Sequence, residues 1–316
     1  KTIKLFIFVI VLQTFSMKNK TLIIIVIITA TAAVLSLGIY QKRTHQINAS
    51  LLQIEQLMYE RPDSAWKILQ HMPSISQLRK EEQALHALLF TQAQYKNHIP
   101  VKSDSLLRIA EAYYRTSNDS LHKAWTLFYL AQYYRDSDEK EKALSYFQQA
   151  NIASRNIENN QFKFLLNLHW AGLLTNEDAY EKGIEKYQTA NRYAILLKDT
   201  LKQINLYGKW GWCCLLKEED ERADSLFNVG LTLSATTKDR IYDKYLLNYL
   251  SLTARERKDY KRALELVNRS LSLAKDSTEL YPLWGNKGEI LLEMNQYDSA
   301  HFYLSKDTRD YDPYFR

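Results

Sequence analysis

One pattern recurs every 40 residues, and it constrains the fold of this 316-residue chain more than any other feature. The segment EKALSYFQQA (141–150) sets Ala143, Phe147 and Ala150 at i, i+4 and i+7, which is one face of an α-helix. Small residues in a buried stripe let a second helix come close, and the large residue between them fills the gap. The same pattern recurs downstream, with its first small residues at Ala143, Gly183, Ala223 and Ala263. Four occurrences at one period predict a repeat architecture.

Each of these helices follows another apolar segment that carries a small residue directly after a large one. The four pairs are Leu130-Ala131, Trp170-Ala171, Trp210-Gly211 and Leu250-Ser251. No proline lies between residues 101 and 281, so long helices joined by short polar turns are predicted. Two helices cannot bury their apolar faces alone, so stacked pairs would share one continuous core. The predicted fold class is therefore all-α, with an α-solenoid of helix-turn-helix units.

These motifs resemble the tetratricopeptide repeat (TPR). Its pattern has a large residue, a small residue and a tyrosine in the first helix, followed by Ala, an aromatic residue and Ala in the second. In the best unit these places are filled by Leu130, Ala131, Tyr134, Ala143, Phe147 and Ala150. The resemblance covers about 47–304, with looser units at both ends. The period exceeds the TPR value of about 34 residues and is typical of HEAT-type repeats, but the alternation of Ala and aromatic residues favours TPR.

The first 40 residues predict a membrane anchor. The segment TLIIIVIITATAAVLSLGIY (21–40) has no charged residue and would span about 30 Å as a helix. A cleaved signal peptide is the alternative, because Lys18 and Lys20 precede the segment and Ala30-Thr31-Ala32 has the spacing of a cleavage site. The apolar run continues to Tyr40, which favours an uncleaved anchor. The four lysines before it favour an N-terminus inside, although a start at Met17 would leave two basic residues on each side; a single-pass protein of the bacterial inner membrane with extracytoplasmic repeats is predicted.

The expected organisation has five parts. A lead (1–20, with Met17 as an alternative start) is followed by the anchor (21–40), a degenerate helical pair (41–102), a TPR-like superhelix (103–304) and the start of a further helix (305–316). Pro313 suits the first position of that last helix, which suggests a fragment of a longer protein. The segments 58–72 and 84–114 also resemble the opening of membrane-tethered bacterial TPR proteins. That resemblance implies a coiled-coil or helix-turn-helix output module beyond the repeats.

Neither catalysis nor a cofactor is predicted. Of the 42 basic residues, four lie in residues 1–40, which leaves 38 against 36 acidic ones, and so nearly neutral a remainder argues against nucleic-acid binding. The seven histidines are scattered, and no phosphate-binding loop or HExxH motif is present, so no metal site is predicted. The adjacent Cys213 and Cys214 are interpreted as small helix-face residues, with a redox pair as the alternative. His169 is interpreted as a structural or groove-lining residue rather than a catalytic base.

The TPR resemblance implies that the first helix of each unit lines a concave binding groove. Its groove positions correspond to Tyr129, Gln132, Arg135, His169, Asn205, Lys209, Trp212, Asn248, Tyr249 and Arg255. This mixture of aromatic and hydrogen-bonding groups suits an extended or helical peptide. The prediction is a membrane-anchored scaffold for a protein or peptide partner, with self-association left open. The alternative is a peptide-sensing regulator whose output domain is missing from this chain.

Overall fold

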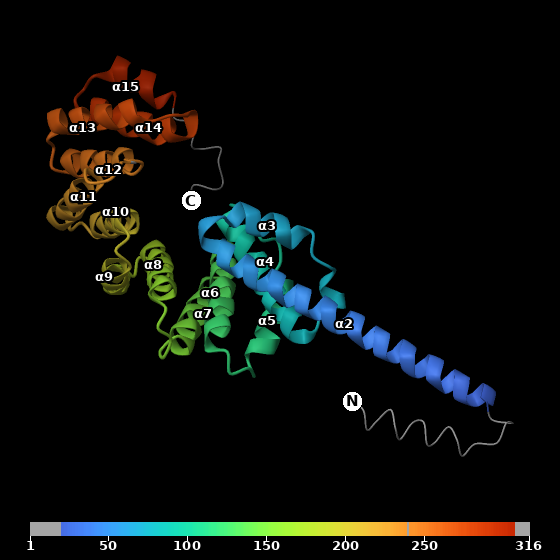
Figure 1. Ribbon diagram of the computed structural model, residues 1–316. Helices are drawn as coiled ribbons and strands as arrows, with labels where there is room; N and C mark the ends of the chain where they lie inside the picture. Colours follow the sequence, from blue (N-terminus) through green and yellow to red (C-terminus); the bar gives the residue numbers. More distant parts are fainter. Residues whose placement is uncertain (1–19, 239, 307–316) are drawn as a thin grey trace. The chain divides into compact units, whose positions relative to one another are not determined.

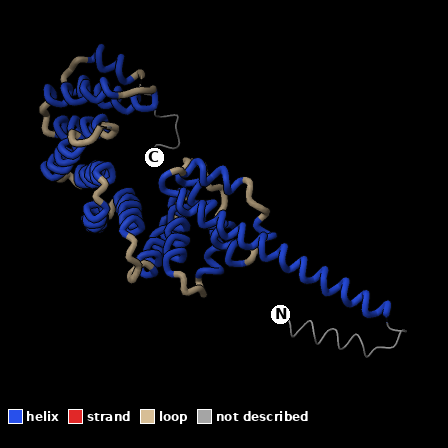
Figure 2. Tube along the Cα trace, viewed as in Figure 1, coloured by secondary structure: helices blue, strands red, loops and turns tan. Residues whose placement is uncertain are grey.

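The computed structural model describes the backbone of residues 20–238 and 240–306, and all regular elements there are helices (Figure 2). The chain divides into two compact units, 1–113 and 114–316. Residues 1–19 of the predicted lead and residues 307–316 of the predicted last helix lie outside the described residues.

The described part of the first unit is built from four helices and a short 3-10 helix. They are α2 (Lys20–Glu60), α3 (Pro62–Gln70), η2 (Ile75–Gln77), α4 (Lys80–Lys96) and α5 (Ser105–Tyr114). The C-terminal half of α2 packs on α3 and α4. Its buried face carries Ile47, Leu51, Ile54 and Met58, which follow helical spacing.

The structure contradicts the predicted membrane location. Residues 21–40 continue without a break into the amphipathic part of α2, and among the described residues no helix has the length and apolar character needed to cross a membrane. The segment 21–40 forms the N-terminal half of this 41-residue helix. It also contains the hydroxyls of Thr31 and Ser36, which donate to backbone carbonyls. The prediction of a single-pass inner-membrane protein is therefore wrong.

Over residues 114–238 and 240–306, the second unit consists of five successive helix pairs; Figure 1 labels these helices. They are α6 (Ser120–Asp136) with α7 (Lys140–Ala153), α8 (Asn160–Asn176) with α9 (Tyr180–Leu197), α10 (Thr200–Leu216) with α11 (Asp220–Ser234), α12 (Asp243–Glu256) with α13 (Tyr260–Leu273), and α14 (Ser277–Glu293) with α15 (Tyr297–Leu304). The helices α6, α8 and α10 begin at a spacing of 40 residues, as do α7, α9, α11 and α13. The predicted repeat is thus confirmed in the helix boundaries.

The predicted stripes form the core of the second unit. Ala143, Phe147 and Ala150 of α7 are fully buried, and so are the small residues Ala131 and Ala171 of the first helices. At Gly211 an added Cβ would lie 2.7 Å from Cδ1 of Phe227, so α10 and α11 approach each other too closely for a side chain. Small residues therefore set the spacing of the paired helices.

Two kinds of turn repeat with the same period. Between the helices of a pair, Asp138, Asp178, Glu218 and Lys258 adopt left-handed backbone with φ of 55–64°. The following amide donates to the carbonyl five residues earlier, as from Glu139 to Tyr134 at 2.8 Å, which is a Schellman cap. Between pairs, the side chains of Asp119, Asn159 and Asp199 accept a hydrogen bond from the backbone amide three residues on.

The two cysteines are core residues of α10. Cys213 and Cys214 are fully buried free thiols, and burial raises the pKa of Cys214 to about 12. Thiols with raised pKa values are poor nucleophiles at neutral pH, because little thiolate is present. The interpretation as small helix-face residues is confirmed.

Candidate functional site

Five of the ten predicted partner-binding residues line one pocket of about 270 Å³ in the second unit. They come from four successive first helices: Arg135 on α6, His169 on α8, Lys209 and Trp212 on α10, and Tyr249 on α12. His169, Lys209 and Tyr249 follow one another at intervals of 40 residues. They are therefore equivalent positions in three successive repeats, and all three line the pocket. We call this cavity the donor pocket, for the reason given next. Its other lining residues are Leu168, Gly172, Leu173, Thr175, Asn176 and Tyr187.

The hydrogen bonds of His169 fix its tautomer. Its Nδ1 lies 3.2 Å from an Arg135 guanidinium nitrogen and 3.1 Å from the Gln132 amide nitrogen. Arginine can only donate, so Nδ1 accepts and the proton of the neutral ring sits on Nε2. Burial and the charges of Arg135 and Lys209 lower the pKa of His169 to about 3, which keeps the ring neutral. His169 thus brings an N–H donor to the pocket.

The charge of the pocket is positive. Arg135 pairs with Asp136 at 2.6 Å, whereas Lys209 has no ion pair or hydrogen bond with any described residue. Lys209 keeps an exposed surface, yet the protein around it displaces much of its water, and this desolvation together with the Arg135 charge lowers its pKa. No carboxylate is among the lining residues. Arg135, His169 and Lys209 therefore present only donors.

Aromatic rings form one wall of the donor pocket. The rings of Trp212 and Tyr249 are 5.4 Å apart between centroids, and Tyr249 lies 5.2 Å from Phe227 of α11. Phe227 is buried and packs against the ring of Tyr249. Such rings offer apolar contact at a low entropic cost, because each has only two side-chain torsions.

The other five predicted residues have different surroundings. Gln132 is buried behind His169, and Tyr129 is buried against Trp125 and Phe128, so neither lines the pocket. Asn248 accepts from Asn286 at 2.8 Å. Arg255 lines a second pocket and is surrounded by Glu256, Glu289 and Glu293, while Asn205 lines neither pocket.

Sequence reasoning overlooked several lining residues of α8. Gly172 and Asn176 lie three and seven residues after His169, on the same helix face, and both line the pocket. The helical spacing from His169 could have identified them. Among the residues that the structure describes, no group of three or more His, Cys, Asp or Glu is arranged to hold a metal ion.

The neutral state of His169 predicts a pH-dependent stability. The folded pKa of about 3 lies below the ordinary value of about 6.5, so the contribution is complete above about pH 6.5 and is lost as the pH falls toward 3. We expect the stability difference between the wild type and His169→Gln to shrink as the pH is lowered through that range. Urea unfolding at a series of pH values measures it, and a difference independent of pH would refute the neutral buried ring.

Comparison with known proteins places the fold. No protein-family model matches the sequence, and no curated protein does. Among solved structures, a Rap protein complexed with competence and sporulation factor has a TM-score of 0.66 at 11% identity, covering 84% of this chain and 76% of that one. NprR in complex with its cognate peptide NprX has a TM-score of 0.65 at 14% identity, covering 84% and 78%. The apo form of RapI has 0.64 at 16%, covering 91% and 83%.

The fold is that of TPR-type helical-repeat proteins. The predicted TPR resemblance is thereby confirmed at the level of the fold. Identities of 11–16% show a shared architecture and leave the partner to be argued from the residues of the site.

Proposed function

We propose that the second unit binds a peptide segment of a partner on the face formed by α6, α8, α10 and α12. The observation that carries the proposal is the convergence of four successive first helices on one pocket that combines hydrogen-bond donors with an aromatic wall. Pockets of this kind orient a ligand through a few polar groups and gain affinity from apolar contact.

The likeness to solved structures supports a peptide as the ligand. NprR was solved with its cognate peptide, and the Rap protein with competence and sporulation factor. Both have the same repeat fold. The donor pocket has its own residues, and the proposal rests on them.

A double substitution in the donor pocket should weaken peptide binding without unfolding the protein. Peptides selected from a phage-displayed random library against the full chain are expected to bind Lys209→Glu with Tyr249→Ala at least about tenfold more weakly. Both side chains are partly solvent-accessible on the pocket wall, so helicity should be kept. Fluorescence polarisation of the labelled peptides gives the affinities, and circular dichroism the helicity.

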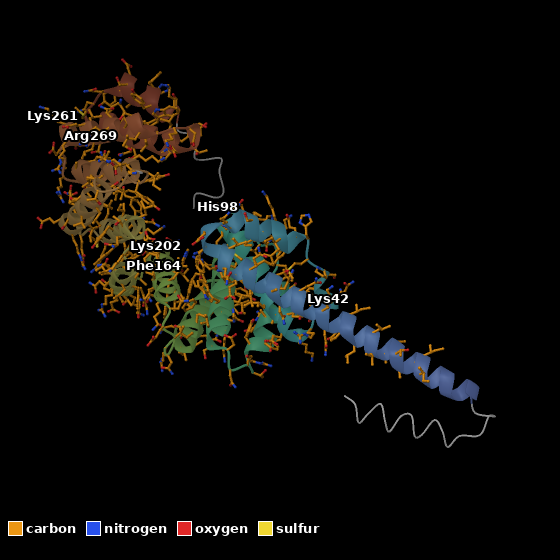
Figure 3. All side chains as sticks on the ribbon, viewed as in Figure 1. Lys42, His98, Phe164, Lys202, Lys261 and Arg269 are labelled. Atoms are coloured by element: carbon orange, nitrogen blue, oxygen red, sulfur yellow. The ribbon has the colours of Figure 1, made fainter. Side chains whose placement is uncertain are left out.

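A matched control carries the same two changes away from the pocket. Lys261 on α13 and Tyr297 on α15 are exposed, so Lys261→Glu with Tyr297→Ala should bind as the wild type does (Figure 3). If both double variants bind the peptides equally well, the donor pocket is not the peptide-binding site. A chain that selects no peptides at all would refute peptide binding.

A further inference from the structure

Trp212 is shared by two pockets of different charge. It lines the donor pocket, and it also lines a second pocket of about 530 Å³. We call the second cavity the acidic pocket; its other lining residues are Leu215, Leu216, Glu218, Asp220, Leu252, Arg255 and Glu256. Both cavities lie along α10 and α12. A ligand that reaches both pockets past Trp212 therefore meets a different charge in each.

The donor pocket has no carboxylate among its lining residues. Lys209 has no carboxylate partner among the described residues, and the neutral ring of His169 contributes an N–H donor beside it. The unpaired ammonium of Lys209, the neutral N–H of His169 and a guanidinium that also pairs with Asp136 are together complementary to a carboxylate. They are poorly complementary to a cation or to a second donor.

The charge of the acidic pocket is opposite to that of the donor pocket. Arg255 is engaged by Glu289 of α14 and by Glu256, so it is neutralised within the protein. Glu218 and Asp220 have no ion pair within residues 20–238 and 240–306. The pocket thus keeps a net negative charge from two carboxylates.

The acidic pocket also has an apolar floor. Leu215, Leu216 and Leu252 line it beside the indole of Trp212. Lysine and arginine bury an aliphatic stem while the charged head stays in water, and an arginine head also stacks on an indole. This combination fits a basic side chain better than a small cation.

We propose that the groove binds a peptide in one direction, with a carboxylate in the donor pocket and a lysine or arginine side chain in the acidic pocket, the two pockets sharing Trp212. The inference rests on the proposed peptide binding and adds the class of peptide. Because the two pockets differ in charge, reversing the order of the peptide's charges would place like charges together in both pockets.

Peptide pools of defined charge order test this inference. Each peptide of a pool contains one glutamate and one lysine at a fixed spacing, with all other positions random and both termini blocked. One pool has the glutamate first and a second pool has the lysine first. In the control pools glutamine replaces either the glutamate or the lysine. We expect one order and spacing to bind the full chain at least about tenfold more tightly than the reverse order and than both glutamine pools. Pools with a free C-terminus and no glutamate show whether a terminal carboxylate can occupy the donor pocket.

A charge exchange in the protein sharpens the test. The variant Lys209→Glu with Glu218→Lys should prefer the reversed order, while the control Lys261→Glu should keep the wild-type preference. Equal binding of both orders by the wild type would overturn the inference and leave peptide binding intact. If binding requires the glutamate but not the lysine, the acidic pocket does not bind the peptide and that part of the inference is wrong. If no pool binds the wild type, both the inference and the proposed function fail.

Discussion

Replacing Phe147 with alanine is expected to lower the free energy of unfolding by about 3–5 kcal/mol. Phe147 is fully buried in α7, with its ring centroid 6.1 Å from that of Phe128 on α6 and 6.3 Å from that of Trp170 on α8. It therefore joins two successive repeats, and its removal leaves a cavity between them. Urea unfolding followed by far-ultraviolet circular dichroism measures the loss.

The matched control is a phenylalanine at the end of the array. Phe302 on α15 is 51% exposed, so Phe302→Ala should change the free energy of unfolding by less than about 1 kcal/mol. If the two substitutions have equal effects, the stripe of Ala143, Phe147 and Ala150 is not the core that the repeat implies.

The second large effect is expected at Gly211, where Gly211→Ala should cost about 1–3 kcal/mol. The new methyl group would lie 2.7 Å from Cδ1 and 2.9 Å from Cζ of Phe227, so α10 and α11 would have to move apart. Phe227 also supports Tyr249 in the donor pocket, so the wall of that pocket would shift with it. Thermal or urea unfolding gives the cost.

Another helical glycine distinguishes crowding from helix propensity. A Cβ at Gly172 would meet only the Tyr187 hydroxyl, at 4.0 Å. Gly172→Ala should therefore stabilise the chain by up to about 1 kcal/mol, because alanine is the better helix former. A stabilising effect at Gly211 would mean that the helices of the third pair do not cross there.

The repeat could be predicted because packing requires small residues at fixed positions. Ala131, Ala143 and Ala150 recur as Ala, Gly or Ser, and each side chain is buried where the period places it. The turns could not be predicted in the same way. The left-handed positions carry Asp138, Glu218 or Lys258 rather than glycine, so the usual signal for such backbone is missing.

The site was predicted in part, because equivalent positions in a repeat can have different surroundings. Tyr129 and His169 occupy the same position in successive units. Tyr129 stacks on Trp125, with ring centroids 5.8 Å apart, and is buried, whereas His169 lines the donor pocket. Position along the helix fixes the direction of a side chain, and the neighbouring unit decides whether it is covered.

The membrane prediction was wrong, because no helix among the described residues is both long and apolar enough to cross a membrane. The segment 21–40 is the first half of a helix that continues to Glu60, and the second half of that helix packs on α3 and α4. Composition alone does not distinguish such a segment from a membrane span.

Mapping the contact site of a selected peptide tests the central claim most directly. A peptide carrying a photoreactive group would be crosslinked to the full chain and the modified residues identified by mass spectrometry. We predict crosslinks on α8, α10 and α12 around Trp212 and Tyr249, which line the donor pocket. Crosslinks confined to α7, α9, α11 and α13, or to the first unit, would contradict binding at that pocket.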